Sequence, residues 1–101
     1  MIVYNISIKI DPHIEKEWIE WHKKEYAAGI IETGVPADHK FFRLLEQDET
    51  EGIIYVDQYF FSSKDQYKKY VEVFAPVFEE KAFKKWGNQF ISFYTVMEVV
   101  N

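Results

Sequence analysis

The sequence predicts a single α+β domain with the order strand, helix, strand, strand, helix, strand. Residues 2–10 alternate apolar and polar side chains, which is typical of a strand with one buried face. Residues 12–31 carry apolar side chains at helical spacing, and strand-like and helix-like patterns recur in the second half. A chain of 101 residues has room for one core, so residues 1–101 are expected to form one domain.

The first strand is predicted over residues 2–10 and the first helix over residues 12–31. Asp11 suits the position that caps the helix, and Pro12 suits the first helical position, where a missing N–H costs nothing. Gly34 can adopt the left-handed conformation that ends a helix. These signals predict a long amphipathic helix directly after the first strand.

The remaining elements are predicted as a strand over 39–47, a strand over 53–61, helices over 63–73 and 76–86, and a strand over 89–100. The acidic loop 48–52 suits a hairpin connection. Ser63 and Gln66 form a capping pattern that opens the second helix. Pro76 is expected to break or bend this helix and to begin its last part.

This order gives a ferredoxin-like β-α-β-β-α-β fold, with a four-stranded antiparallel sheet that carries both helices on one face. The bare face is predicted to hold Val3, Tyr55 or its neighbours, Tyr59, Phe61 and several residues of the last strand. Nineteen aromatic side chains are too many for one covered face, and exposed apolar area costs roughly 25 cal/mol per Å². We therefore expect a homodimer through the open sheet face, which gives a dimeric α+β barrel.

Composition excludes several classes of function. The net charge of −5 argues against nucleic acid as a partner, because no stretch concentrates Lys and Arg on one face without interleaved acids. The absence of cysteine excludes disulfides and thiolate chemistry. No apolar run approaches the length of a membrane span, and the start lacks a basic leader, so a cytoplasmic location is expected by default.

Glu25 is the sharpest candidate for chemistry. Helical spacing places it in the middle of the apolar stripe with Trp18 and Trp21, and His22 lies one turn away. A carboxylate desolvated among tryptophans suits general acid or base catalysis. In the alternative interpretation, Glu25 bonds to Arg43 or Tyr4 and holds the helix on the sheet. The residues predicted to line a ligand pocket are Trp18, Trp21, Glu25, Tyr26, Asn5 and Arg43.

The histidines His13, His22 and His39 do not have metal-ligand spacing. No His-x₃-His or Glu-x-x-His pair occurs, so no metal site is predicted. His13 and His39 are expected to face solvent. Residues 64–86 contain no histidine that could serve as an axial haem ligand, and no cofactor is predicted.

Motifs along the whole chain resemble those of one family. They are Met1-Ile2-Val3-Tyr4-Asn5, Trp18-Ile19-Glu20-Trp21, Thr33-Gly34, Arg43-Leu44-Leu45-Glu46, Gln58-Tyr59-Phe60, Phe74-Ala75-Pro76 and Glu98-Val99-Val100. The sequence resembles an uncharacterised bacterial family, domain of unknown function 4286. The resemblance implies an intracellular protein with a ferredoxin-like, dimeric α+β barrel topology, and it implies no activity.

The sequence departs from this family at two places. The family often has Glu-His-Ile-Pro where this chain has Glu25-Tyr26-Ala27-Ala28, and a second histidine of the last helix is replaced near Ala82. A family site that used those imidazoles is therefore not expected here.

Two functions follow as hypotheses. The first is a homodimeric module that binds a small hydrophobic ligand or a protein partner. The alternative is a cofactor-independent dimeric-barrel enzyme, monooxygenase-like or isomerase-like, with Glu25 or His22 as the acid–base group.

Overall fold

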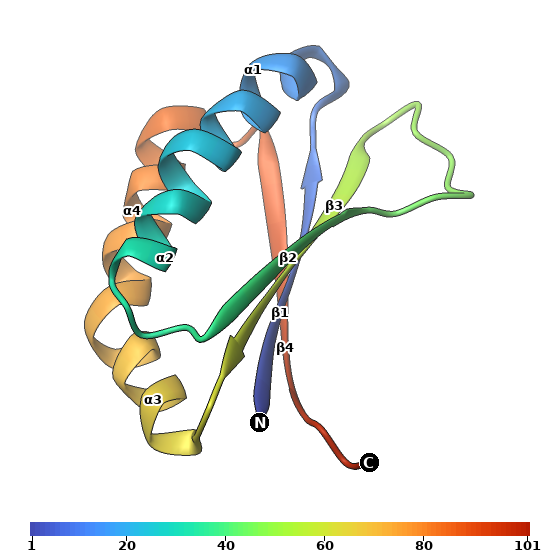
Figure 1. Cartoon of the computed structure of the whole chain (residues 1–101). Coiled ribbons are helices and arrows are strands. Elements are labelled where there is room, and N and C mark those ends of the chain that lie inside the picture. Colours follow the sequence, from blue (N-terminus) through green and yellow to red (C-terminus); the bar gives the residue numbers. More distant parts are fainter.

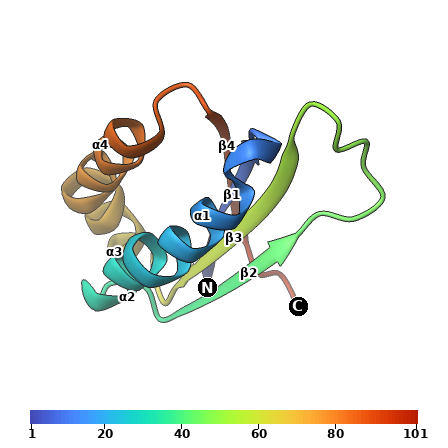
Figure 2. The ribbon, with the colours of Figure 1, turned by 90° about the horizontal axis from the view of Figure 1, so that it is seen from above.

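The computed structural model describes residues 1–101 and has the predicted order of elements. The elements are β1 (Ile2–Ile10), α1 (Glu15–Trp21), α2 (Ala28–Glu32), β2 (Asp38–Arg43), β3 (Ile53–Phe61), α3 (Lys64–Lys69), α4 (Ala75–Trp86) and β4 (Phe90–Glu98). The strands form one antiparallel sheet in the order β2-β3-β1-β4. All helices cover one face of this twisted sheet (Figures 1 and 2). The fold is therefore ferredoxin-like, as predicted.

The first helix begins and ends where the sequence predicts. The Asp11 carboxylate accepts a hydrogen bond of 2.9 Å from the backbone N–H of His13, and Pro12 occupies the first helical position. Gly34 ends the helix with φ at +74°, a conformation that glycine adopts without steric cost. Between α1 and α2 the chain forms a π-helical segment, η2 (His22–Ala27), in which backbone hydrogen bonds join residues five apart instead of four.

The second helix also contains a π-helical segment, η3 (Tyr70–Phe74), between α3 and α4. Ser63 caps its start, since its hydroxyl accepts a hydrogen bond of 3.2 Å from the N–H of Gln66. Pro76 is the second residue of α4, after Ala75, and so lies just beyond η3. A widened turn relieves the contact between a proline ring and the preceding turn, so the chain continues as a helix through the predicted bend.

The second strand is shorter than predicted because β2 ends at Arg43. Three residues later Glu46 adopts φ of +59°, which turns the chain out of the strand. Asp48 then accepts hydrogen bonds from the N–H and hydroxyl of Thr50, and Arg43 pairs with Glu49 at 2.7 Å. Residues 44–52 therefore form a loop that projects beyond the sheet (Figure 1).

The register of β1 and β3 shows which side chains face the helices. Directly opposed residues of an antiparallel pair point to the same face, and Tyr59 is opposite Tyr4, Tyr55 opposite Ile8 and Phe61 opposite Ile2. The prediction that Tyr55, Tyr59 and Phe61 lie on the bare face is therefore wrong. These rings are buried in the core beneath the helices, and Tyr59 and Phe61 are fully inaccessible to solvent.

The open face of the sheet is nevertheless apolar. The register places on it Val3, as predicted, together with Phe42, Val56, Phe60, Ile91, Phe93 and Met97. Phe93 on the edge strand β4 is 59% exposed, and Phe42, Ile91 and Met97 are also exposed. A polar row of Lys40, Gln58, Asn5 and Thr95 crosses this face between the apolar side chains. Exposed apolar groups gathered on one face of a sheet mark an interaction site.

Two contacts fix the helices on the sheet and on each other. The hydroxyl of Tyr55 donates a hydrogen bond of 2.7 Å to the Glu15 carboxylate, and burial together with this bond raises the pKa of Tyr55 to about 12. Gly29 lies so close to the second helix that a Cβ atom there would be 2.9 Å from Cε1 of Phe78. None of the helices has the length and apolar character needed to cross a membrane.

Candidate functional site

Two histidines and one aspartate form a hydrogen-bonded cluster in the core. His22 Nε2 lies 2.6 Å from Oδ2 of Asp57, and His39 Nε2 lies 2.7 Å from Oδ1 of the same carboxylate. His22 comes from η2, His39 from β2 and Asp57 from the middle of β3. The cluster therefore joins the first helix to two strands of the sheet.

The cluster is almost completely withdrawn from water. The side chains of Asp57 and His22 are 0% and 1% exposed, and that of His39 is 17% exposed. Burial alone would raise the pKa of the Asp57 carboxyl, but the hydrogen bonds and charges of His22 and His39 outweigh burial and lower that pKa. Asp57 is therefore an ionised acceptor, and each Nε2 atom donates to it.

The π-helical segment η2 decides which side chains of the first helix face this cluster. The inward-facing residues are Ile14, Trp18, His22, Tyr26 and Ile30, each four positions after the last. A regular α-helix would rotate such a stripe away from the sheet, and the extra residue in η2 corrects the rotation. Tyr26 therefore takes the inward place that regular helical spacing gives to Glu25.

Glu25 is exposed, and the prediction of a carboxylate buried among tryptophans is wrong. It lies beside Lys24 and Lys81 in a groove on the outer side of the two helices. The alternative prediction of a bond to Arg43 also fails, because Arg43 pairs with Glu49 at 2.7 Å and with Glu15 at 3.6 Å.

Aromatic rings enclose the His22 imidazole. Its centroid lies 4.4 Å from the ring of Trp18, 5.2 Å from Tyr26 and 5.0 Å from Phe41, all in stacked orientation. The apolar rings limit the movement of the imidazole, and the bond to Asp57 fixes its rotation. His22 is therefore held in one orientation.

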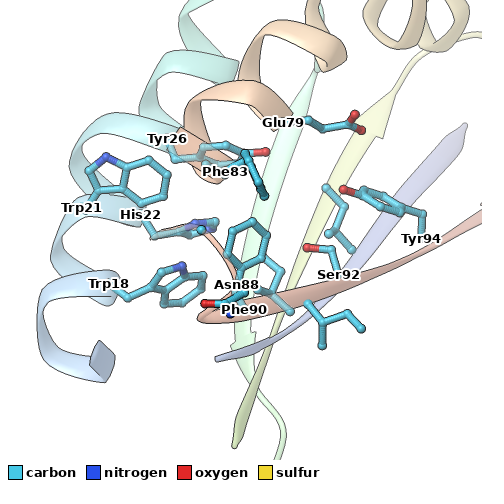
Figure 3. A pocket seen from close by; sticks show the side chains of 15 residues that line it. Trp18, Trp21, His22, Tyr26, Glu79, Phe83, Asn88, Phe90, Ser92 and Tyr94 are labelled. Atoms are coloured by element: carbon cyan, nitrogen blue, oxygen red, sulfur yellow. The ribbon is translucent and has the colours of Figure 1, made fainter. Parts of the chain in front are cut away.

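A cavity of about 410 Å³ lies between the helices and β4 (Figure 3). His22 forms part of its wall together with Trp18, Trp21 and Tyr26 from the first helix. The opposite walls come from α4 and β4, with residues that include Ala82, Phe83, Phe90, Ser92 and Tyr94. The lining is mostly apolar, and its volume is in the range that small-molecule sites occupy.

Glu79 is the acidic residue of this cavity. It is exposed, and its side chain extends toward Tyr94 in Figure 3. Behind this part of the cavity, burial raises the pKa of the Tyr26 and Tyr70 hydroxyls, and nearby Glu79 adds to both shifts. Two further buried polar atoms, the Tyr59 hydroxyl and Trp86 Nε1, have no hydrogen-bond partner.

A second cavity, of about 440 Å³, also borders His22. It is lined by His22, His39 and Phe41 and by the charged residues Lys23 and Glu32. His22 therefore borders both cavities, and His39 borders only the 440 Å³ one.

The predicted pocket residues are only partly together. Trp18, Trp21 and Tyr26 line the 410 Å³ cavity, whereas Glu25 does not. Asn5 points to the open face, where its side chain accepts a hydrogen bond of 3.2 Å from Gln58. Arg43 lies at the far end of β2, outside this cavity.

Sequence reasoning missed Asp57 and the role of His39. His39 was predicted to face solvent, but its bond to Asp57 draws it into the interior. The available signal was Asp57 itself, an acid on the face of a strand otherwise occupied by Ile53, Tyr55, Tyr59 and Phe61. A charge on such a face needs partners, and histidines are candidates.

The histidine–aspartate cluster does not have the arrangement of a metal centre. No group of three or more histidine, aspartate or glutamate side chains in the structure converges to hold a metal ion. His13, as predicted, is at the surface, where its side chain is 93% exposed and contacts Asp11.

Three solved structures share this fold at low sequence identity. A dimeric ferredoxin-like protein from an uncultured marine organism has a TM-score of 0.77 and 10% identity, with 99% of this chain and 95% of that chain covered. SnoaB, a cofactor-independent oxygenase from Streptomyces nogalater, has a TM-score of 0.67 and 13% identity, with coverage of 99% and 94%. The monooxygenase from the gene ActVA-Orf6 of Streptomyces coelicolor, in complex with the ligand Nanaomycin D, has a TM-score of 0.59 and 12% identity, with coverage of 99% and 89%.

No curated protein matches the sequence. The model of one protein family, described as Domain of unknown function (DUF4286), matches residues 1–100. This is the family that the sequence motifs indicate. Because the match spans nearly the whole chain, the protein belongs to the DUF4286 family.

Proposed function

We propose that the protein is a homodimer that binds a small, largely apolar molecule in the 410 Å³ cavity of each chain. The observation that carries this proposal is the cavity itself, which combines a mostly apolar wall with the fixed imidazole of His22. Sites for small molecules have this composition, with apolar side chains that provide affinity and a few polar groups that fix orientation.

Two of the structures with the same fold are consistent with this proposal. SnoaB is a cofactor-independent oxygenase, and the monooxygenase from the gene ActVA-Orf6 was solved with Nanaomycin D. At such low sequence identity, the similarity shows that this chain has the same fold and does not show that it has the same activity. They support the proposal because one protein of this fold was solved with an organic ligand bound and another acts without a cofactor.

The dimer is proposed to form through the open face of the sheet. This face carries exposed Phe42, Ile91, Phe93 and Met97, and an aromatic side chain buried between two copies is strongly stabilising. A standard stable interface buries roughly 800 Å² of each partner, so most of this face would have to be covered. A structure of the same fold is named as that of a dimeric protein.

Ligand binding is tested by filling the cavity. Ala82 on α4 lines it and is buried, so Ala82→Leu should reduce affinity for any molecule found by native mass spectrometry or by a tryptophan-fluorescence screen. The matched control is Ala37→Leu, at an exposed alanine outside the cavities. Equal ligand affinity in both variants would show that the cavity is not the binding site. A screen that finds no ligand for the wild-type protein would contradict the proposal.

Dimerisation is tested by sedimentation equilibrium at micromolar concentration. Phe93→Glu should give a monomer, because it introduces a charge into the proposed interface. Phe83→Glu is the matched control, since Phe83 is similarly exposed but lies on α4, on the helix side of the sheet. A wild-type monomer, or a Phe93→Glu dimer of unchanged affinity, would refute the proposed interface.

A second candidate function is a cofactor-independent enzyme, monooxygenase-like or isomerase-like, with His22 as the acid–base group. The observation that favours it is the bond of His22 to buried Asp57, an arrangement that orients an imidazole for proton transfer. Glu25 is not proposed for this role because it is exposed outside the cavity. In a metabolite turnover screen, His22→Gln should abolish any activity found and retain binding, and turnover by this variant at the wild-type rate would exclude the role.

A further inference from the structure

The hydrogen bonds of His22 define which of its nitrogens can accept a proton. Nε2 lies 2.6 Å from ionised Asp57 and is therefore the donor in that bond. In the neutral form of His22 the single N–H is therefore at Nε2, and Nδ1 carries a lone pair. Nδ1 makes no hydrogen bond within the chain, although the side chain is 1% exposed. His22, which lines the cavity, therefore has one ring nitrogen fixed on Asp57 and one, Nδ1, without a partner in the chain.

We propose that the molecule bound in the 410 Å³ cavity is a weak acid, namely a flat apolar skeleton that carries a phenol or enol hydroxyl. This inference rests on the proposed ligand-binding function and names the chemical class of the ligand. The hydroxyl donates its hydrogen bond to His22 Nδ1. On full transfer the O–H bond breaks, an N–H bond forms at Nδ1, and the electron pair stays on the ligand oxygen as a phenolate or enolate.

Asp57 and His39 are positioning residues in this proposal. The Asp57 carboxylate holds the proton of His22 on Nε2 and faces the imidazolium that transfer would create. The second carboxylate oxygen is bound by His39 at 2.7 Å, so Asp57 cannot rotate away from His22. Removal of either residue is therefore expected to act through His22.

The charges around His22 favour a weak acid over a carboxylic acid. Its contacts are Asp57 from β3 and the aromatic rings of Trp18, Tyr26 and Phe41, with His39 from β2 on the far side of Asp57. The charged or titratable groups farther along the two cavity walls are Lys23, Glu32, Glu79 and Tyr94. The 410 Å³ cavity thus holds Glu79 and no lysine or arginine. A ligand that arrives already ionised would find no fixed cation there, whereas a neutral hydroxyl finds an acceptor.

The test uses two probes, para-nitrophenol and its methyl ether para-nitroanisole. They share the nitrophenyl skeleton, and only the phenol has a hydroxyl to donate. The phenol should bind about tenfold more tightly or better, as expected for a hydrogen bond with ionic character. Bound para-nitrophenol should also show the visible absorption of its phenolate at a pH where the free probe is mostly neutral. Nitrogen NMR of the free protein should show His22 protonated at Nε2 and unprotonated at Nδ1.

Asp57→Asn tests the positioning role. An amide offers one acceptor and one donor, so one of the two histidines must move its proton to Nδ1. The expected result is a changed tautomer population in the NMR spectrum and a weaker phenolate band, with para-nitroanisole binding retained. Glu25→Gln, an acid-to-amide change outside the cavity, is the control and should leave both readouts unchanged.

The outcomes separate this inference from the function on which it rests. If the ether binds as tightly as the phenol, or if bound para-nitrophenol stays neutral, the inference is overturned while the binding cavity stands. Binding of neither probe also overturns it, and the Ala82→Leu screen then decides the proposed function independently. Because the comparison of the two probes needs only the wild-type protein, a variant that fails to fold does not prevent the test.

Discussion

Replacement of Asp57 by alanine should cost about 3–5 kcal/mol of unfolding free energy. The carboxylate accepts hydrogen bonds of 2.6 and 2.7 Å from two imidazoles, and bonds to a charged group contribute about 1.5–3 kcal/mol each. The sum agrees with the roughly 3–5 kcal/mol lost when one partner of a buried ionic cluster is removed. Since a domain of this size has about 5–15 kcal/mol in total, the variant should fold but with much reduced stability.

The assay is urea unfolding at fixed protein concentration, followed by tryptophan fluorescence and far-UV circular dichroism. Trp18, stacked 4.4 Å from His22, reports on the cluster directly. Glu25→Ala is the control, because it removes an exposed carboxylate and should not shift the midpoint. A loss below about 1 kcal/mol for Asp57→Ala would refute the reasoning, because the imidazoles would then not depend on the carboxylate.

The triple change Asp57→Leu, His22→Phe and His39→Phe asks why the cluster is present. A buried ionic cluster replaced as a whole by apolar side chains of similar volume often leaves stability unchanged or improved. We expect the triple variant to be more stable than Asp57→Ala. That result would indicate that the protein keeps this cluster for its chemistry, whereas a further loss of stability would indicate a structural role.

Three further predictions use the same unfolding assay or a simple binding assay. The contribution of ionised Asp57 to the free energy of unfolding should be complete above its ordinary pKa of 3.8 and decline as the pH falls below that value, because folding lowers this pKa. A stability difference between wild type and Asp57→Asn that grows on acidification would contradict this. Gly29→Ala should lower the free energy of unfolding by about 1 kcal/mol, since a Cβ atom 2.9 Å from the ring of buried Phe78 costs more than the gain in helix propensity. A stabilised variant would show that the Phe78 ring moves aside freely. Glu25→Gln should leave ligand affinity unchanged, and a large loss would restore Glu25 as a site residue.

The fold was predictable because local signals and the hydrophobic pattern agree. The alternation over residues 2–10, the cap at Asp11, the stop at Gly34 and the cap at Ser63 all act within a few residues of the position they define. Each can be recognised in sequence without knowledge of what packs against it.

The site was less predictable because it depends on helix phase and strand register. One extra residue in η2 exchanges Glu25 for Tyr26 on the inward face, and hydrophobic periodicity at 100° per residue cannot reveal it. The assignment of strand faces failed at Tyr55 and Tyr59 because both faces of β3 are rich in apolar groups. The partnership of His22, His39 and Asp57 spans 35 residues and becomes visible only when register is known.

The edge strand β4 has a consequence for how the protein would respond to dilution. Ser92 and Tyr94 on one side of the strand line the cavity, and Phe93 and Met97 on the other side belong to the open face. A shift of this strand therefore changes both surfaces at once. A ligand that draws β4 toward α4 should therefore alter the constant for self-association. Thermodynamic linkage then requires that separation of the two copies alters the dissociation constant of the ligand by the same factor. Identical ligand titrations above and below the dimer dissociation constant would reveal this coupling, and superimposable curves would exclude it.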